Sequence, residues 1–284
     1  MLGRALSFPV SGTEGGKTYV LGGLTVAGLV VGNLLAAGGL AAVADATTAE
    51  RAVEPVAYGL LVGGGLLGVV CYLLLAGVAR RLLATAARGE RRVPAFGRVP
   101  TLLADGVRVL AVKAAYLLPA VVLGSLSAGL AEAPLTGTAR VVSRSAAALA
   151  LLVCLLYLVV LFYVVPAAVT MFAVEDSLRA AFDLGRLRTA VISEDYAVGW
   201  VGGTVLVGVG GLVGLGLVVV LVGVFALFHV GAAGRYCYGT AVGRALGYAD
   251  RDDAAETDTG PDTEQAPAAV PGEDPMAAEI RRRY

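Results

Sequence analysis

The longest stretch without Asp, Glu, Lys or Arg is YAVGWVGGTVLVGVGGLVGLGLVVVLVGVFALFHVGAAG, from Tyr196 to Gly234. Its 39 residues would make a helix of about 58 Å, nearly twice the roughly 30 Å hydrocarbon core of a bilayer. A run this long cannot cross a membrane as one straight helix, so we expect it to fold back on itself. The glycine-dense segment Gly208–Gly216 is where a tight turn costs least.

Four more uncharged windows precede this one, and each is long enough to span a bilayer: 18–44, 55–79, 114–131 and 145–174. The chain is 57% hydrophobic and holds 39 glycines among its 284 residues, which excludes an ordinary soluble domain. The sequence therefore predicts an all-α fold, a polytopic membrane helical bundle with about six transmembrane helices. The predicted spans are about 18–44, 55–79, 110–131, 145–174, 196–214 and 217–243.

The distribution of Lys and Arg predicts how these spans are oriented. An even number of spans places both termini on one side, and the segments on that side hold 15 Lys and Arg. The opposite side holds only Arg51, Arg140 and Arg144. Because basic residues accumulate on the cytoplasmic side, we expect a multi-pass protein of the cell membrane with cytoplasmic N- and C-termini.

Two connections on the basic side have amphipathic patterns. The segment LRAAFDLGRL, Leu178–Leu187, predicts a short helix lying on the membrane surface, with Asp176 or Ser177 as its N-cap. The segment PTLLADGVRVLAVK, Pro100–Lys113, predicts an interfacial helix that precedes the third span.

The ends of the chain differ from the membrane domain, 18–247. Residues 1–17 form a cytoplasmic lead-in, whose segment SGTEGGKT resembles a phosphate-binding loop. A phosphate loop needs a glycine five residues before Gly16, and Ser11 stands there instead, so nucleotide binding is not expected. The acidic segment 248–284 holds four prolines and is predicted to be a disordered cytoplasmic tail.

Six arginines between the second and third spans are candidate contacts for anionic lipid head groups, because basic clusters beside a span attract an acidic leaflet. These are Arg80, Arg81, Arg88, Arg91, Arg92 and Arg98. No aromatic residues alternate with them, so nucleic acid is not an expected partner. Orientation of the chain alone is the simpler interpretation.

Polar residues inside the spans are candidates for lining a cavity: Asn33, Ser125, Ser127, Thr170, Thr204 and His229. A catalytic pair of Ser127 and His229 is conceivable, but the residues around Ser127 do not fit a G-x-S-x-G motif, and a packing histidine is the simpler interpretation. Cys71, Cys154 and Cys237 stand apart in apolar runs and indicate no metal site. We expect no catalytic residues and no cofactor or metal.

Glycines recur four residues apart in several spans, as in Gly28/Gly32, Gly64/Gly68 and Gly239/Gly243. This spacing lets helix backbones approach closely, either within one chain or across a homo-oligomer interface.

Several segments together resemble an uncharacterised archaeal membrane family, domain of unknown function 4013, which is frequent in halophiles. The resemblance rests on MLGRALSFP (1–9), ARRLLATAARGERRVPAF (79–96), YLLPAVVLG (116–124), YVVPAAVTMFAVEDSLRAAFDLGRL (163–187) and YCYGTAVGRALG (236–247). It implies a multi-span membrane protein from a haloarchaeal source and supplies no activity, ligand or catalytic residue.

Three functions remain open at this point. A scaffold or accessory subunit that organises lipids or partner proteins comes first, because no predicted span carries the buried acidic or paired charges of ion-coupled transport. A transporter for a neutral or apolar solute is the alternative. An intramembrane enzyme comes third.

Overall fold

The computed structural model describes residues 2–10, 15–45, 54–90, 93–218 and 221–249, and the rest of the chain lies outside this description. Throughout the described residues the regular structure is helical, without strands, which confirms the all-α fold. The elements are α1 (Leu2–Ser7), η1 (Phe8–Val10), α2 (Gly15–Asp45), α3 (Glu54–Ala87), α4 (Val99–Glu132), α5 (Gly137–Glu175), α6 (Leu178–Ala181), α7 (Leu184–Ile192), α8 (Glu194–Gly216) and α9 (Val222–Leu246).

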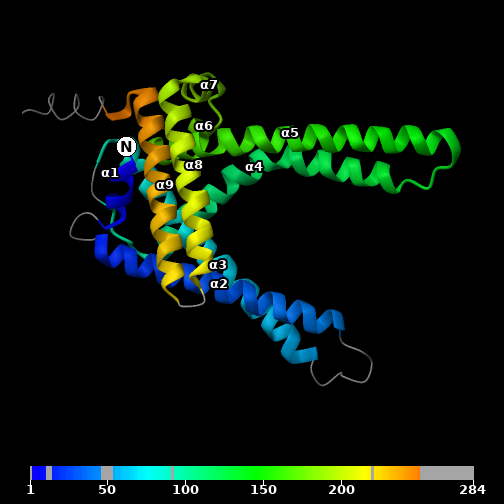
Figure 1. Ribbon diagram of the computed structural model, residues 1–284, viewed down its shortest axis with the longest axis horizontal. Helices are drawn as coiled ribbons and strands as arrows, with labels where there is room; N and C mark the ends of the chain where they lie inside the picture. The colour runs from blue at the N-terminus through cyan, green and yellow to red at the C-terminus, as the bar shows by residue number, and fades with distance from the viewer. Residues whose placement is uncertain (1, 11–14, 46–53, 91–92, 219–220, 250–284) are drawn as a thin grey trace, which may run out of the picture. The chain divides into compact units, whose positions relative to one another are not determined.

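Five of these helices are long and apolar enough to cross a membrane: α2, α3, α4, α5 and α8. The sixth long helix, α9, has 25 residues, but His229 and Arg235 interrupt its apolar run. It packs along α8 as the return arm of the same hairpin (Figure 1). The described part of the chain is thus a multi-pass membrane protein of helical hairpins.

Three hairpins make up the structure: α2–α3, α4–α5 and α8–α9 (Figure 1). Helices α3 and α9 contact each other, and each also contacts members of the other hairpins, so they form the centre of the assembly. The hairpins join at one end, which we call the base. It consists of Ala76–Ala87 of α3, Leu102–Val112 of α4, Ala167–Ala173 of α5, Ala232–Gly243 of α9, and the short helices α6 and α7.

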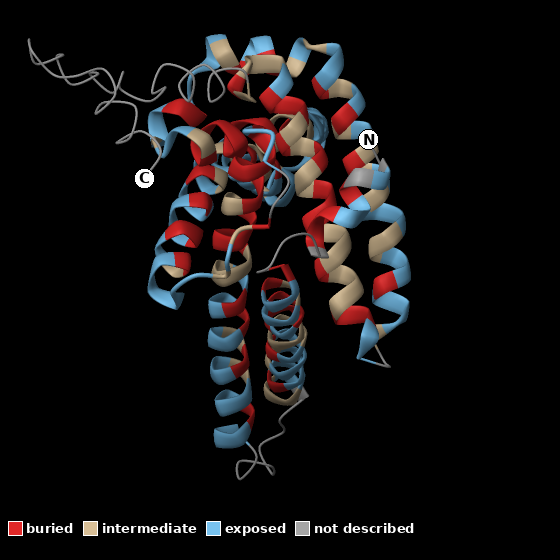
Figure 2. Ribbon diagram, turned by 90° about the vertical axis from the view of Figure 1, so that its left-hand side faces the viewer, coloured by how far each residue is buried: buried red, intermediate tan, exposed pale blue. Residues whose placement is uncertain are grey.

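Burial is concentrated at this base and thins along the hairpins (Figure 2). At the base, residues 167–173 of α5 are buried on every face of the helix. Farther out, α5 buries only one stripe, which consists of Ser143, Ala147, Cys154 and Leu161. Ala147 and Cys154 of this stripe meet Ser127 and Ala120 of α4. Large apolar side chains between these positions are exposed, as expected of surfaces that face lipid.

Close backbone contact at glycines brings the helices together. A Cβ atom on Gly32 of α2 would lie 2.6 Å from the backbone nitrogen of Gly68 on α3. Between α3 and α4, a Cβ on Gly77 would collide with the Leu102 carbonyl, and one on Gly106 would collide with that of Leu73. Small residues at these points allow van der Waals packing where lipid provides no hydrophobic driving force.

Several boundaries differ from the sequence prediction. Helix α8 continues to Gly216 and α9 begins at Val222, so the glycine-dense segment Gly208–Gly216 is helical instead of forming the turn. Helix α4 runs without a break from Val99 to Glu132, so the predicted interfacial helix and third span are one continuous helix of about 51 Å.

The predicted surface helix at 178–187 is two helices, α6 and α7. Ser177 is the N-cap residue of α6, as predicted, but its side chain makes no cap hydrogen bond. Asp183 caps α7, and its side chain accepts hydrogen bonds from the Gly185 and Arg186 amides at 3.1 Å. Tyr116 fixes α6 to α4, since its hydroxyl donates to the Ala181 carbonyl at 2.6 Å and its ring stacks on Phe182.

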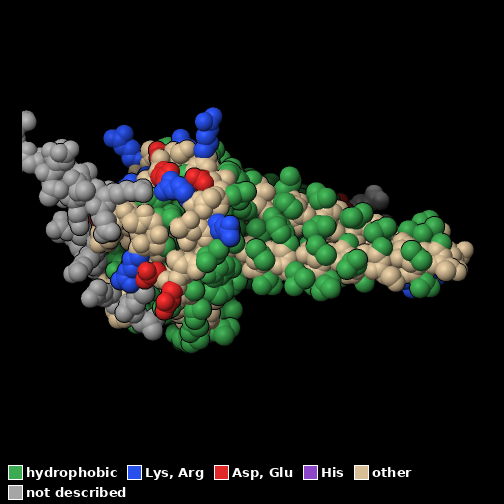
Figure 3. Space-filling view, turned by 90° about the horizontal axis from the view of Figure 1, so that it is seen from above, with side chains coloured by type: hydrophobic (Ala, Val, Ile, Leu, Met, Phe, Trp, Pro, Cys, Tyr) green, Lys and Arg blue, Asp and Glu red, His purple; other side chains and the backbone are tan. Residues whose placement is uncertain are grey.

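Charged side chains gather over the base, and hydrophobic side chains cover the α4–α5 hairpin (Figure 3). The surface is therefore charged at the base and mostly hydrophobic along the α4–α5 hairpin. The predicted disordered tail begins too early, because Tyr248 is buried at the base. From residue 250 on, the tail lies outside the described residues.

Candidate functional site

A network of ion pairs holds three helices together at the base. Arg80 of α3 donates to Asp105 of α4 and to Asp176 at the end of α5, where the Nη2 to Oδ1 distance is 2.6 Å. Arg81 also pairs with Asp105, at 3.3 Å, and donates to the Thr101 hydroxyl at 3.2 Å. The Arg80 guanidinium lies over the Phe172 ring, 4.9 Å from its centroid. Asp105 is only 8% exposed, so its charge depends on these arginines.

Asp176 ends α5 in a left-handed conformation, with φ of 49°. Aspartate tolerates this conformation better than most residues. The left-handed turn directs its carboxylate toward Arg80 and toward Arg108 of α4, whose Nη1 lies 3.4 Å away.

These contacts change the interpretation of the arginine cluster between the second and third spans. Arg80 and Arg81 are engaged by carboxylates of the same chain, so we assign them to the fold rather than to lipid head groups. Arg88 donates to the Val174 carbonyl at 3.0 Å. Arg98 precedes α4 and is exposed, whereas Arg91 and Arg92 lie outside the described residues.

A second polar cluster joins the ends of α5, α7 and α9. The Glu175 carboxylate pairs with Arg186 and accepts a hydrogen bond from the Tyr248 hydroxyl at 2.7 Å. Arg186 also donates to that hydroxyl, at 2.9 Å. Desolvation lowers the pKa of the Arg186 guanidinium, but its hydrogen bond with Glu175 and the nearby charges raise the pKa overall above its ordinary value. The Arg186 guanidinium therefore stays ionised, and this cluster joins α5, α7 and α9 at the base.

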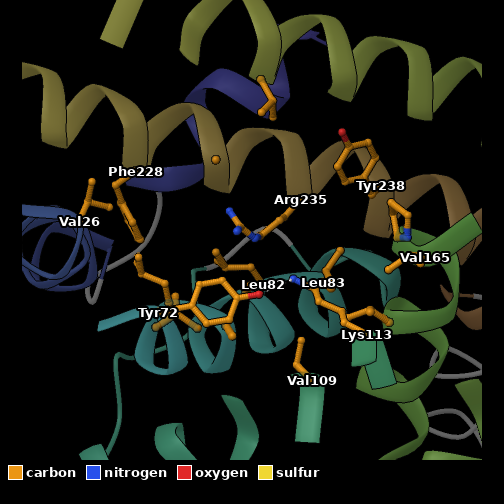
Figure 4. A pocket seen from close by; sticks show the side chains of 18 of the residues that line it. Val26, Tyr72, Leu82, Leu83, Val109, Lys113, Val165, Phe228, Arg235 and Tyr238 are labelled. Carbon is orange, nitrogen blue, oxygen red and sulfur yellow. Dashed lines mark hydrogen bonds between the residues drawn. The ribbon is translucent and has the colours of Figure 1, made fainter. Parts of the chain in front are cut away.

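A central cavity of about 500 Å³ lies between the three hairpins (Figure 4). All six long helices contribute to its wall, which is mostly apolar. Its polar side chains are Tyr72 of α3, Lys113 of α4, and Arg235 and Tyr238 of α9. Lys113 donates to the Tyr72 hydroxyl at 3.3 Å, and its ammonium lies 5.6 Å from the centroid of the Tyr72 ring. Arg235 and Tyr72 point into the cavity from opposite walls (Figure 4).

The six polar residues expected to line a cavity do not line this one. Asn33 is exposed and donates to the Leu29 carbonyl of its own helix at 2.8 Å, and Ser125 is exposed on α4. Thr170 is buried and donates to the Pro166 carbonyl at 2.7 Å. Thr204 comes nearest, since its hydroxyl shares a 3.2 Å hydrogen bond with Tyr238 of the wall.

Ser127 and His229 also do not form a pair. Ser127 donates to the Ala147 carbonyl inside the α4–α5 hairpin at 2.8 Å. The His229 ring packs edge-on against Tyr19 of α2, with 5.9 Å between centroids. Each residue thus has a packing or hydrogen-bonding partner within the fold.

The sequence prediction did not include Lys113 and Arg235, the two cationic residues that line the cavity. Arg235 is one of the 15 basic residues that the sequence assigns to the cytoplasmic side, but it lies in the middle of α9 and faces the cavity. A signal was present: the apolar pattern continues past Arg235 to Gly243, which places a cation inside a span. Lys113, one of only two lysines in the chain, stands directly before the uncharged window of the third span.

This fold of apolar helical hairpins defines the chain as a multi-pass helical membrane protein. A family model described as "Protein of unknown function (DUF4013)" matches residues 60–219, more than half of the chain. The chain belongs to this family. No curated protein and no solved structure matches it.

Proposed function

We propose that the chain is a scaffold or accessory subunit of the cell membrane, with both termini in the cytoplasm. The observation that carries this proposal is the contrast between the base and the outer parts of the hairpins. The base is fixed by a buried carboxylate, by paired arginines and by helix backbones in contact at Gly77 and Gly106. Beyond it, α4 and α5 bury only the seam between them.

This arrangement favours a fixed frame over a moving transporter. Transporters place their substrate sites at discontinuous helices near the bilayer midplane. Here Pro119 and Pro166 lie within helices that continue through them. A rigid base with long apolar arms can instead bind the membrane helices of partner proteins along those arms.

The exposed arginines of the base support the cytoplasmic orientation and a contact with lipid head groups. Arg98, Arg179 and Arg188 are exposed at the end of the molecule that positive-inside orientation assigns to the cytoplasm. There they can bind anionic head groups of the adjacent leaflet. A haloarchaeal source is part of this proposal, and the excess of 20 arginines over 2 lysines supports it together with the acidic C-terminal segment.

Photo-crosslinking from one face of α5 tests the scaffold role. A photoreactive residue at Leu156, which is 59% exposed, should form a discrete adduct with a partner protein or a second copy in native membranes. The same residue at Cys154, which faces α4, should form adducts only within the chain. If Leu156 gives lipid adducts alone, the scaffold proposal fails.

The transporter alternative keeps one supporting observation, the central cavity. Uptake of a neutral solute into vesicles containing the protein, abolished by filling the cavity with Gly231→Trp, would favour it.

A further inference from the structure

Two cationic side chains, Lys113 and Arg235, face the central cavity together (Figure 4). In the part of the chain that the structure describes, the Arg235 guanidinium has no ion pair or hydrogen bond, and the Lys113 ammonium contacts only the neutral Tyr72 side chain. None of the described lining residues is Asp or Glu. The cavity therefore holds two positive charges that its own wall does not neutralise.

The surroundings of Arg235 leave its guanidinium available. Gly231 lies one turn earlier on α9, and a Cβ atom there would be 2.8 Å from Nη1 of Arg235. The missing side chain leaves room for the guanidinium beside the helix, within the cavity. Arg235 is half-buried, and the surface it retains belongs to the cavity wall.

Charges buried among apolar side chains are costly unless a counter-ion accompanies them. The chain supplies such counter-ions where arginines serve the fold, as Asp105 does for Arg80 and Arg81. It supplies none at Arg235 and Lys113. We propose that an anion from outside the chain fills this role: the central cavity binds an amphiphile with one acidic head group and a hydrocarbon chain, held at its head by Arg235 and Lys113.

The rest of the wall accounts for the hydrocarbon chain of the ligand. Beyond the four polar side chains the cavity is lined by aliphatic and phenylalanine side chains, among them Val26, Leu29 and Phe228. Its volume of about 500 Å³ lies within the range of roughly 300–1,000 Å³ typical of small-molecule sites. A free inorganic anion would leave most of this apolar surface uncovered.

The position of Lys113 along its helix is the one expected for binding the head group of an amphiphile that comes from the bilayer. Lys113 is the last charge of α4 before its uncharged part, so the head group would lie at the end of the span nearest the base. Phe162 and Val207 belong to the wall and are also exposed, at 58% and 37%. The hydrocarbon chain of an amphiphile can therefore enter the cavity between α5 and α8 directly from the lipid.

The chain contains a built-in probe for this site. Trp200, the only tryptophan, donates its Nε1 hydrogen to the Phe162 carbonyl at 3.3 Å, and their rings lie 5.3 Å apart. Bromine on a bound hydrocarbon chain quenches tryptophan fluorescence at contact. Full-length protein in non-ionic detergent is titrated with brominated palmitate, with the matching brominated alcohol, with brominated phosphatidic acid, and with acetate in competition.

We expect palmitate or phosphatidic acid to quench Trp200 at concentrations at least ten-fold below the alcohol, and acetate not to compete. The tighter of the two anions identifies the source as a free acid or a membrane lipid. Arg235→Gln and Lys113→Gln should each weaken anion binding about ten-fold and leave alcohol binding unchanged, as expected for loss of one charged hydrogen bond. Arg235→Lys should retain most of the affinity.

Arg244→Gln, on the same helix but away from the cavity, is the matched control and should bind like the unmodified protein. Equal quenching by the acid and the alcohol would overturn the proposal, as would Gln variants that bind the anion normally. Lys113→Gln decides the question if thermal unfolding shows that Arg235→Gln does not fold. This outcome is independent of the scaffold role, which rests on crosslinking at Leu156.

Discussion

Arg80 of α3 lies 2.6 Å from Asp176 at the end of α5, and the same guanidinium binds Asp105 of α4. One side chain thus links members of two hairpins, α2–α3 and α4–α5. The link lies at the base, where charged side chains of the described residues gather (Figure 3). The hairpins are joined at the base both by these polar contacts and by close helix packing at Gly77 and Gly106.

Replacement of Asp105 tests this polar link. Asp105→Asn removes the charge that neutralises Arg80 and Arg81, and loss of one partner of a buried pair costs about 3–5 kcal/mol. The expected result is a large drop in the thermal unfolding temperature of the protein in detergent. Asp176→Asn is the control, because that side chain is 65% exposed and its loss should cost less than about 1 kcal/mol. Equal effects of the two variants would contradict the assigned role of Asp105.

The close contact of α3 with α4 gives a second prediction. Gly106→Ala adds a methyl group that collides with the Leu73 carbonyl, and overpacking of this kind costs about 1–3 kcal/mol. Gly124→Ala, on the same helix, has open space around it and should leave stability unchanged or slightly raised. The stabilities of the two variants are compared by unfolding them with guanidinium or with heat. A harmless Gly106→Ala would mean that α3 and α4 do not approach so closely.

Tyr248 supplies a third prediction, for the far side of the base. Tyr248→Phe removes the hydroxyl that links Glu175 and Arg186 but keeps the buried ring. We expect backbone amides of α7 to exchange hydrogen about five-fold to ten-fold faster, since one hydrogen bond contributes about 1 kcal/mol. Exchange in the outer part of α5, near Cys154, should not change. If the amide exchange rates of α7 are the same in the variant and in the unmodified protein, Tyr248 does not stabilise this helix.

Much of the fold could be predicted because membrane helices reveal themselves by length and apolarity. The uncharged window 145–174 lies within α5, and the fold-back of the stretch from Tyr196 to Gly234 is present as the α8–α9 hairpin. The position of its turn was wrong because helix packing overrode glycine preference: Gly210 and Gly214 fit against Val230 and Leu227 of α9 as helical residues.

The site was harder to predict for a different reason. A single sequence shows which residues lie in spans but not which spans are neighbours. Asn33 and Ser125 are polar and intramembrane, yet each lies on an outer part of a hairpin away from the cavity. Lys113 and Arg235 are 122 positions apart, and only the packing of α4 and α9 around α3 brings them to the same cavity.

The account depends most on the membrane topology, and cysteine labelling measures it directly. The three natural cysteines are buried, which leaves a quiet background for introduced ones. Thr136→Cys at the α4–α5 tip and Leu217→Cys at the α8–α9 turn test the tips, and Glu90→Cys and Thr189→Cys test the base; all four positions are exposed. With an impermeant maleimide on intact cells, we expect both tips to be labelled and both base positions to react only after the membrane is opened. Labelling of the base with protected tips would reverse the orientation, and labelling of both from outside would show that these hairpins do not cross the membrane.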